Sequence, residues 1–267
     1  MPSLTEFKTP YDFKGLHGLY NLDRYDRWSR PDSMAVANVW NQAFERGPDF
    51  SDLGSPLYRE PASGLNGHGI ITFTTNEGMI EASGSSIQQD QSGRKDDFIH
   101  WMYESPLLFM VVMRKTGSFD ADRGWWGYGS TLDGYGLRTN ISSQFEFEYE
   151  QTDGARNTTI LTKTPTIDQW EICMCHWDGG INGSIRVGIT QFYEDAQVID
   201  LSVNGLDPDG GDGAGYPGTQ WQIGRFGGSY MNAGDAAMWG FWVAEPNEKG
   251  WDGLLRWAGT KYGITLS

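Results

Sequence analysis

The chain carries three glutamates in alternation with aromatic residues, in the sequence FEFEYE at residues 145–150. On a β-strand, Glu146, Glu148 and Glu150 share one face, and the aromatic side chains share the other. A retaining glycosidase needs two carboxyl groups about 5–5.5 Å apart, one as nucleophile and one as acid/base. The alternative is an acidic face open to solvent, behind an aromatic stripe in the core. From the residues alone we expect this second arrangement.

A second candidate site lies in the sequence RGWWGYGSTLDGYG, residues 123–136. Its four aromatic residues, Trp125, Trp126, Tyr128 and Tyr135, are spaced by glycines. Exposed aromatic rings with a few polar neighbours suit stacking against a sugar or contact with a protein. We therefore take these four residues as ligand-contact candidates, within a segment that reads as glycine-rich turn. The alternative is a pair of strands whose rings pack inward.

A third candidate is the loop GLDPDGGDGAGYPG, residues 205–218. Asp207, Asp209 and Asp212 offer the hard oxygen ligands that Ca²⁺ prefers, although their spacing differs from that of an EF-hand. The alternative is a solvated turn with no metal. Calcium is the one cofactor that the sequence raises, and we otherwise expect none.

The two cysteines, Cys173 and Cys175, stand two residues apart in the sequence WEICMCHW. On a strand both point the same way, with Cα atoms roughly 6.8 Å apart, at the limit of disulfide geometry. We expect both to be reduced and buried. His176 points to the opposite face, so the run CMCH does not predict a metal site. The histidines are scattered, and no catalytic triad order or phosphate-binding loop is present.

The charge balance excludes several partners. There are 35 acidic and 20 basic residues, for a net charge of −15. Such a chain is repelled by nucleic-acid phosphates and by anionic membrane surfaces. No apolar run approaches the ~18 residues of a membrane span, and residues 1–13 lack the apolar core of a secretory signal. We therefore expect synthesis in the cytoplasm without a signal peptide.

The elements that must position these residues are short strands between turn signals. Strands are predicted near residues 16–22, 68–75, 107–113, 144–150, 170–177, 184–193, 196–204, 221–226 and 235–245. One helix is predicted near the end, because Trp251, Leu254, Leu255 and Ala258 fall on one helical face and Gly263 follows as a stop signal. The expected fold is an all-β antiparallel sandwich with one short C-terminal helix. Residues 1–14 form an N-terminal arm, and residues 15–267 form one domain.

Several stretches resemble laminin-G and pentraxin domains of the concanavalin A-like jelly-roll superfamily. They are TIDQWEICMCHWDGG and SIRVGI, then VIDLSVNG, then WQIGRFGGSYMNAGDAAMWGFWVAE, and last GWDGLLRWAGTKYGIT. The opening stretches GLHGLYNLD, VANVWNQAFERGPDFSD and PLYREPASGLNGHGIITF are similar as well. The resemblance covers roughly residues 15–264 and implies a lectin-like sandwich, a fold that hosts lectins, glucanases and structural modules.

The resemblance also bears on single residues. It implies that Trp221, Ile223, Trp239 and Phe241 fill the core, and Asp235 is expected to begin its strand at the surface. Laminarinase-type glucanases carry Glu-x-Asp-x-(x)-Glu on the concave sheet, and FEFEYE is similar but has Glu148 where those enzymes have Asp. In a hydrolase of this type, Glu146 would be the nucleophile and Glu150 the acid/base. Laminin-G and pentraxin domains often hold Ca²⁺ at loop edges.

Three functions follow as hypotheses. The first is a non-enzymatic structural or adhesion protein of a bacteriophage virion, such as a capsid decoration, fibre or tail component. Its partners would be other virion proteins, a host surface glycan and further copies of itself, with residues 1–14 as a docking segment. The second is a carbohydrate-binding lectin, and the third a glucanase-like hydrolase. We favour the first, because similar stand-alone sandwiches with a terminal KYGI helix resemble proteins of phage particles.

Overall fold

The computed structural model describes residues 10–12, 15–23, 34–40, 42–43, 49–60, 65–81, 107–118, 123–129, 134–150, 156–177, 184–189, 197–200, 221–226, 229–243 and 248–266.

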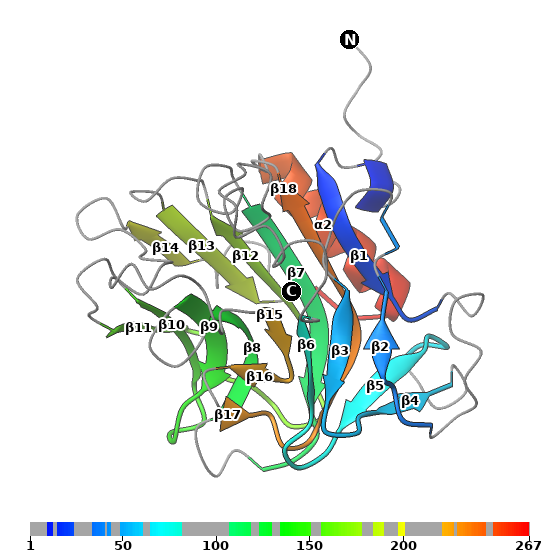
Figure 1. Ribbon diagram of the computed structural model, residues 1–267. Coiled ribbons are helices and arrows are strands. Elements are labelled where there is room, and N and C mark those ends of the chain that lie inside the picture. Colours follow the sequence, from blue (N-terminus) through cyan, green and yellow to red (C-terminus); the bar gives the residue numbers. More distant parts are fainter. Residues whose placement is uncertain are drawn as a thin grey trace, which may run out of the picture.

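The described chain forms two antiparallel β-sheets packed face to face, with a helix on the outside of one of them (Figure 1). Sheet A has the strand order β14-β13-β12-β7-β18-β5-β4, and β1 also pairs with β18. Sheet B has the order β11-β10-β9-β8-β15-β6-β3-β2. A separate hairpin, β16-β17, contacts β8 and β9 of sheet B. The predicted sandwich with one C-terminal helix is thereby confirmed.

The bounds of the elements are as follows. Sheet A consists of β1 Leu16–Asn21, β4 Leu57–Arg59, β5 Ile70–Phe73, β7 Leu107–Lys115, β12 Trp170–Trp177, β13 Ser184–Ile189, β14 Gln197–Asp200 and β18 Gly234–Val243. Sheet B consists of β2 Asn38–Val39, β3 Phe50–Leu53, β6 Gly78–Glu81, β8 Arg123–Gly129, β9 Gly134–Thr139, β10 Phe145–Glu150, β11 Arg156–Ile160 and β15 Trp221–Ile223. The remaining elements are η1 Pro10–Asp12, β16 Arg225–Phe226, β17 Ser229–Tyr230 and α2 Glu248–Tyr262.

Aromatic rings from both sheets fill the space between them. Phe241 of sheet A lies 4.7 Å from Trp221 of sheet B, and Phe109 lies 4.8 Å from Trp126, measured between ring centroids. These contacts confirm that Trp221 and Phe241 belong to the core. The sequence TQWQIGRFGGSYMNAGDAAMWGFWVAEP contains four described strands, of which β15 and β18 lie in opposite sheets and face each other across the core.

A second apolar layer covers the outer face of sheet A. On β7, every residue from Leu107 to Met113 is buried, because alternate side chains enter the inner core and the layer under α2. The helix contributes Trp251, Leu254, Leu255 and Ala258 to that layer, the face that its sequence predicted. It ends at Tyr262, and Gly263 follows with a φ of 67°, which glycine adopts at little cost.

The structure has more strands than the sequence-based expectation. Residues 123–136 were read as turn with an inward-packing strand pair as the alternative, and the strands β8 and β9 confirm the alternative. The short strands β2, β3, β4, β6 and β11 were not expected. Among the described residues, no helix is both long and apolar enough to span a membrane.

Candidate functional site

The glutamates of β10 lie on the outer face of sheet B, where one arginine binds two of them. Arg138 of β9 donates from Nε and Nη2 to Glu146 Oε1, at 3.2 and 2.8 Å. Its Nη1 lies 3.0 Å from Glu148 Oε2. Asn140 donates to the other oxygen of Glu146 at 3.1 Å. All three nitrogens of the guanidinium therefore face a carboxylate.

The prediction of a solvated acidic face is wrong for these two residues. Glu146 is 7% exposed and Glu148 is 2% exposed. Both carboxylates share one cation, an arrangement that holds β9 to β10. The side chain of Glu150, the acid/base of the hydrolase hypothesis, lies outside the described residues.

On the same face of sheet B, two paired glycines form a flat surface on which an aromatic ring packs, and we name this pair, Gly127 and Gly136, the glycine floor. Gly127 of β8 and Gly136 of β9 are directly paired, and Phe226 of β16 lies on both. A Cβ at Gly136 would come within 2.6 Å of Phe226 Cδ2, and one at Gly127 would overlap the ring. These glycines are required for close packing of the β16-β17 hairpin against the sheet.

The ligand-contact prediction is corrected for three of its four residues. Trp125, Trp126 and Tyr128 are at most 1% exposed and belong to the inner core. An irregularity between Gly124 and Trp126 turns both tryptophans inward, where Trp125 packs 4.9 Å from Phe145. The rings are therefore closed to a ligand. The side chain of Tyr135 lies outside the described residues.

The metal candidates find no support in the described part of the chain. Asp207, Asp209 and Asp212 lie outside it. Among the described residues, no group of three or more His, Cys, Asp or Glu side chains could hold a metal ion. Cys173 and Cys175 are free and buried, as expected. Burial raises the pKa of both thiols, which makes them unreactive.

A polar and aromatic row crosses the outer face of sheet A beside the layer under α2. Its members are opposite one another in register on five strands, and we name them the outer strip: Trp170, Arg114, Asp235, Thr72 and Leu57. On β7, Arg114 is the next outward position after Val112, which is buried under α2. The outer strip therefore begins where the helix layer ends.

Asp235 is the centre of the outer strip. Arg114 Nε donates to Asp235 Oδ2 at 2.6 Å, and Thr72 Oγ1 donates to Asp235 Oδ1 at 2.6 Å. The Asp235 side chain is only 4% exposed, whereas that of Arg114 is 29% exposed. The expectation of a surface aspartate is thus wrong, because two neighbouring strands supply its hydrogen-bond donors.

Arg114 keeps donors to spare. Its guanidinium lies over the half-buried Trp170 ring, 4.9 Å from the centroid. Only Nε is bonded, and no described residue accepts a hydrogen bond from its two terminal amino groups. Asp235 and the Trp170 ring therefore fix the Arg114 guanidinium, and its two terminal amino groups remain as coplanar donors at the partly exposed end of the side chain.

Sequence analysis did not single out Trp170, Arg114 or Thr72 as site residues. They stand at strand ends far apart in the chain, and antiparallel pairing brings them together. One signal was present: Arg114 and Asp235 are charged residues at the ends of two otherwise apolar strands.

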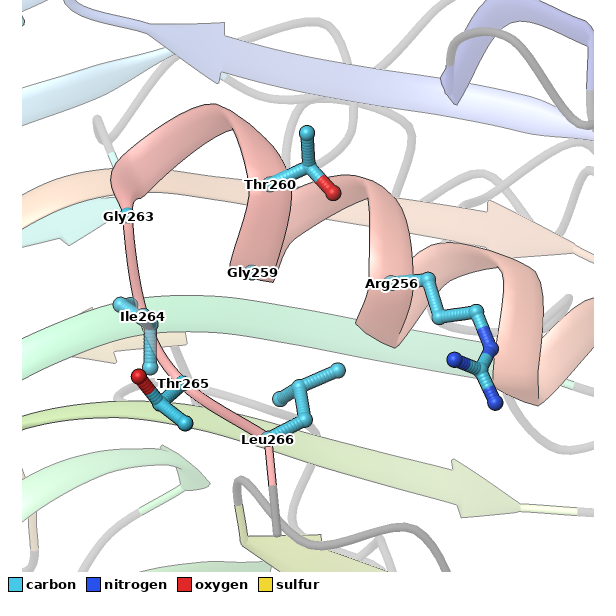
Figure 2. A pocket seen from close by; sticks show the side chains of 7 residues that line it. All are labelled: Arg256, Gly259, Thr260, Gly263, Ile264, Thr265 and Leu266. Carbon is cyan, nitrogen blue, oxygen red and sulfur yellow. The ribbon is translucent and has the colours of Figure 1, made fainter.

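A second surface feature is a hollow of about 440 Å³ at the C-terminal end of α2. Figure 2 shows Arg256 and Thr260 on the helix and Thr265 and Leu266 on the tail that follows Gly263. Arg256 is paired with Asp252 at 3.1 Å, and its side chain is 66% exposed. Asp252 is 28% exposed, whereas the Asp235 side chain that holds Arg114 is 4% exposed, so the outer strip is the better-organised candidate.

Comparisons with known proteins support the fold. No protein-family model matches the chain, and no curated protein sequence matches it significantly. Among solved structures, the receptor-binding domain of botulinum neurotoxin mosaic serotype C/D aligns with a TM-score of 0.55 and 8% identity over 84% of this chain. The type G receptor-binding domain aligns with a TM-score of 0.56 and 5% identity over 91%. Trypanosoma rangeli sialidase aligns with a TM-score of 0.54 and 14% identity over 90%.

The chain is a part-length match to each of these proteins. It spans about half of the neurotoxin domains, 50% and 51%, and 32% of the sialidase. At these identities the likeness establishes a shared β-sandwich architecture. The described chain is therefore an antiparallel β-sandwich, the fold class that the sequence predicted.

Proposed function

We propose that the protein is a non-enzymatic recognition module that binds a neutral saccharide at the outer strip. The observation that carries this proposal is the state of Arg114, which Asp235 and Trp170 hold in place while its two terminal amino groups have no acceptor among the described residues. Sugar hydroxyls accept hydrogen bonds from such donors. The apolar surfaces of Trp170 and Leu57 at the ends of the strip suit the C–H groups of a sugar ring.

The charges favour a neutral ligand over an anionic one. Asp235 lies 2.6 Å from the Arg114 guanidinium and offsets its charge. The chain as a whole carries a net charge of −15. A carboxylate or phosphate group would therefore gain little attraction at the strip and would approach an acidic protein.

The arrangement of the β10 glutamates supports a binding role over hydrolysis. A retaining glycosidase needs one carboxylate free to attack the sugar. Glu146 accepts three hydrogen bonds and Glu148 lies against the same arginine, so neither is placed to attack.

The structural neighbours are compatible with recognition of either glycans or proteins. One neurotoxin binding domain is described in complex with SialylT, and another in complex with rat synaptotagmin II. Both align with this chain over 84% of its length. Their ligands are properties of those proteins, and they motivate a saccharide as the first ligand to test.

The test is a glycan array followed by ligand-observed NMR with Arg114→Lys. Lysine keeps a cation beside Asp235, but its donors all lie on the one nitrogen that Asp235 binds, and it lacks the two planar amino groups that arginine holds toward a ligand. We expect the wild type to bind neutral glycans and Arg114→Lys to weaken binding by about tenfold or more, the loss of a charge-assisted hydrogen bond.

The matched control is Arg256→Lys, the arginine at the rim of the hollow. It should leave affinity unchanged. If Arg256→Lys loses binding and Arg114→Lys does not, the saccharide binds at the hollow in Figure 2, and the assignment of the site to the outer strip is wrong. If the protein binds only sialylated glycans, the proposal that its ligand is neutral is wrong.

We propose adhesion within a bacteriophage particle as the finer role, with a host surface glycan as the ligand. The resemblance of the sequence motifs to phage proteins supports it. Pro10 of the arm is tied to sheet A, since Trp242 Nε1 donates to its carbonyl oxygen at 3.2 Å. Deletion of residues 1–9 should abolish incorporation into particles, and full incorporation would count against a docking arm.

A further inference from the structure

We infer that β11 is a self-association edge, where a second copy of this chain adds its own β11 in antiparallel orientation. The inference is independent of the saccharide site. In the strand order of sheet B, β11 is the terminal strand and pairs only with β10 among the described strands.

The backbone register shows which groups of β11 are open. Leu161 N–H donates to Phe145 C=O at 2.9 Å, which makes this a hydrogen-bonded pair of the β10-β11 ladder. Because such pairs alternate in antiparallel sheets, Thr158 and Ile160 are non-hydrogen-bonded positions opposite Glu148 and Glu146. Their N–H and C=O groups therefore point away from β10, and no described residue binds them.

Two edges of sheet A are, by contrast, covered by the chain itself. Outside β4, Tyr58 N–H donates to Met34 C=O at 2.9 Å, and Val36 N–H donates to Pro56 C=O at 2.8 Å. Outside β1, Gln42 N–H donates to Leu19 C=O at 2.8 Å. Proteins commonly cover or charge their edge strands to prevent pairing. No described residue covers β11 in this way, and Arg156 at its start is the one charged residue of the strand, since residues 157–160 are Asn-Thr-Thr-Ile.

Exposed apolar side chains gather around this edge. Ile160 at the end of β11 is 51% exposed, and Ile141 in the turn between β9 and β10 is 76% exposed. Ile160 is opposite Glu146 in register, and Ile141 follows Asn140, whose side chain donates to Glu146. An apolar cluster beside an open edge is typical of a protein interface.

The charge distribution favours a second copy as the occupant. The chain carries 35 acidic and 20 basic residues, yet residues 156–163, RNTTILTK, contain two basic residues and no acid. Two copies of so acidic a chain repel one another least where both present this stretch. Pairing of β11 with β11 would join the two B sheets and satisfy the open backbone groups of Thr158 and Ile160.

Analytical ultracentrifugation of the full chain at low and high salt tests the inference. We expect a dimer that tightens with salt, because screening reduces the repulsion between the two acidic copies. Ile160→Lys and Thr158→Pro should each raise the dimer dissociation constant by roughly tenfold or more. Proline at 158 removes only an outward N–H, so the fold should be retained.

Met34→Lys is the matched control, since Met34 is 46% exposed beside β4 and far from β11 in strand order. It should leave the dimer unchanged. Amide exchange should slow at Thr158 and Ile160 on dimerisation. A wild type that stays monomeric at high salt, or a dimer that survives both β11 variants, overturns the inference.

Discussion

The outer faces of the two sheets each hold an arginine beside buried carboxylate, and the two arginines differ in what remains available. Arg138 on sheet B directs Nε and Nη2 to Glu146 and Nη1 to Glu148. Arg114 on sheet A directs only Nε to Asp235. The first guanidinium has a carboxylate at each of its three nitrogens, whereas the second is held through Nε alone and keeps two amino groups for another partner.

This difference separates a structural cluster from a candidate binding site better than residue type does. Both clusters combine arginine, carboxylate and a hydrogen-bonding neighbour, and both lie mostly out of solvent. A count of used and unused donors distinguishes them. By this criterion the glutamates of β10 have a structural role, whereas Arg114 of the outer strip keeps donors for a ligand.

The largest expected effect is the loss of stability in Arg138→Met. The substitution leaves Glu146 and Glu148 buried without their shared cation, and removal of one partner from a buried ion pair costs about 3–5 kcal/mol. Arg114→Met also leaves a buried carboxylate without its cation, but only one, and Asp235 keeps the Thr72 hydroxyl, so the loss should lie at the lower end, about 3 kcal/mol. Urea unfolding of the two variants measures both values. Equal losses would contradict the distinction between the two arginines.

The sequence predicted the elements whose pattern is local. The helical face of α2 and the doubly buried β7 depend on neighbouring residues within one element, and both were expected. The inward position of both Trp125 and Trp126 was not predictable in this way. It depends on an irregularity in the β8-β9 register, which breaks the alternation that a regular strand would have.

The candidate sites depend on contacts between distant segments, which explains the remaining errors. The β10 glutamates were expected in solvent, because nothing in FEFEYE indicates the Arg138 that binds them or the Phe226 that packs on the glycine floor beside them. Asp235 was expected at the surface for the same reason. Its partners Thr72 and Arg114 come from β5 and β7, and only the register of sheet A places them beside it.

Glu81 extends the comparison to a carboxyl group inside the sandwich. It accepts a hydrogen bond from Trp221 N–H at 3.3 Å. Burial raises its pKa from 4.5 to about 7, and the Trp221 hydrogen bond only partly opposes that shift. The folded state therefore binds this proton more tightly than the unfolded state, and the stabilisation is full below 4.5 and lost as the pH rises through about 7.

Glu81→Gln should remove this dependence. Above a pH of about 7 the variant should be more stable than the wild type, by about 3 kcal/mol at most, while below 4.5 the two should be alike. Chemical unfolding across this pH range gives both curves. A variant that is less stable than the wild type at alkaline pH would show that the Glu81 carboxylate is well solvated or paired when charged.

The smallest effect distinguishes a positioning residue from a purely structural one. Thr72 Oγ1 donates to Asp235 Oδ1 at 2.6 Å on the side opposite Arg114, so it fixes the carboxylate that fixes the guanidinium. Thr72→Val should cost about 1 kcal/mol of stability, the usual value of one hydrogen bond. It should also weaken saccharide binding by about fivefold at temperatures where the variant is fully folded, and Thr72→Ser should restore both properties. If Thr72→Val lowers stability but leaves affinity unchanged, Arg114 does not need Asp235 to present its donors, and the contrast with Arg138 reduces to one of solvent exposure.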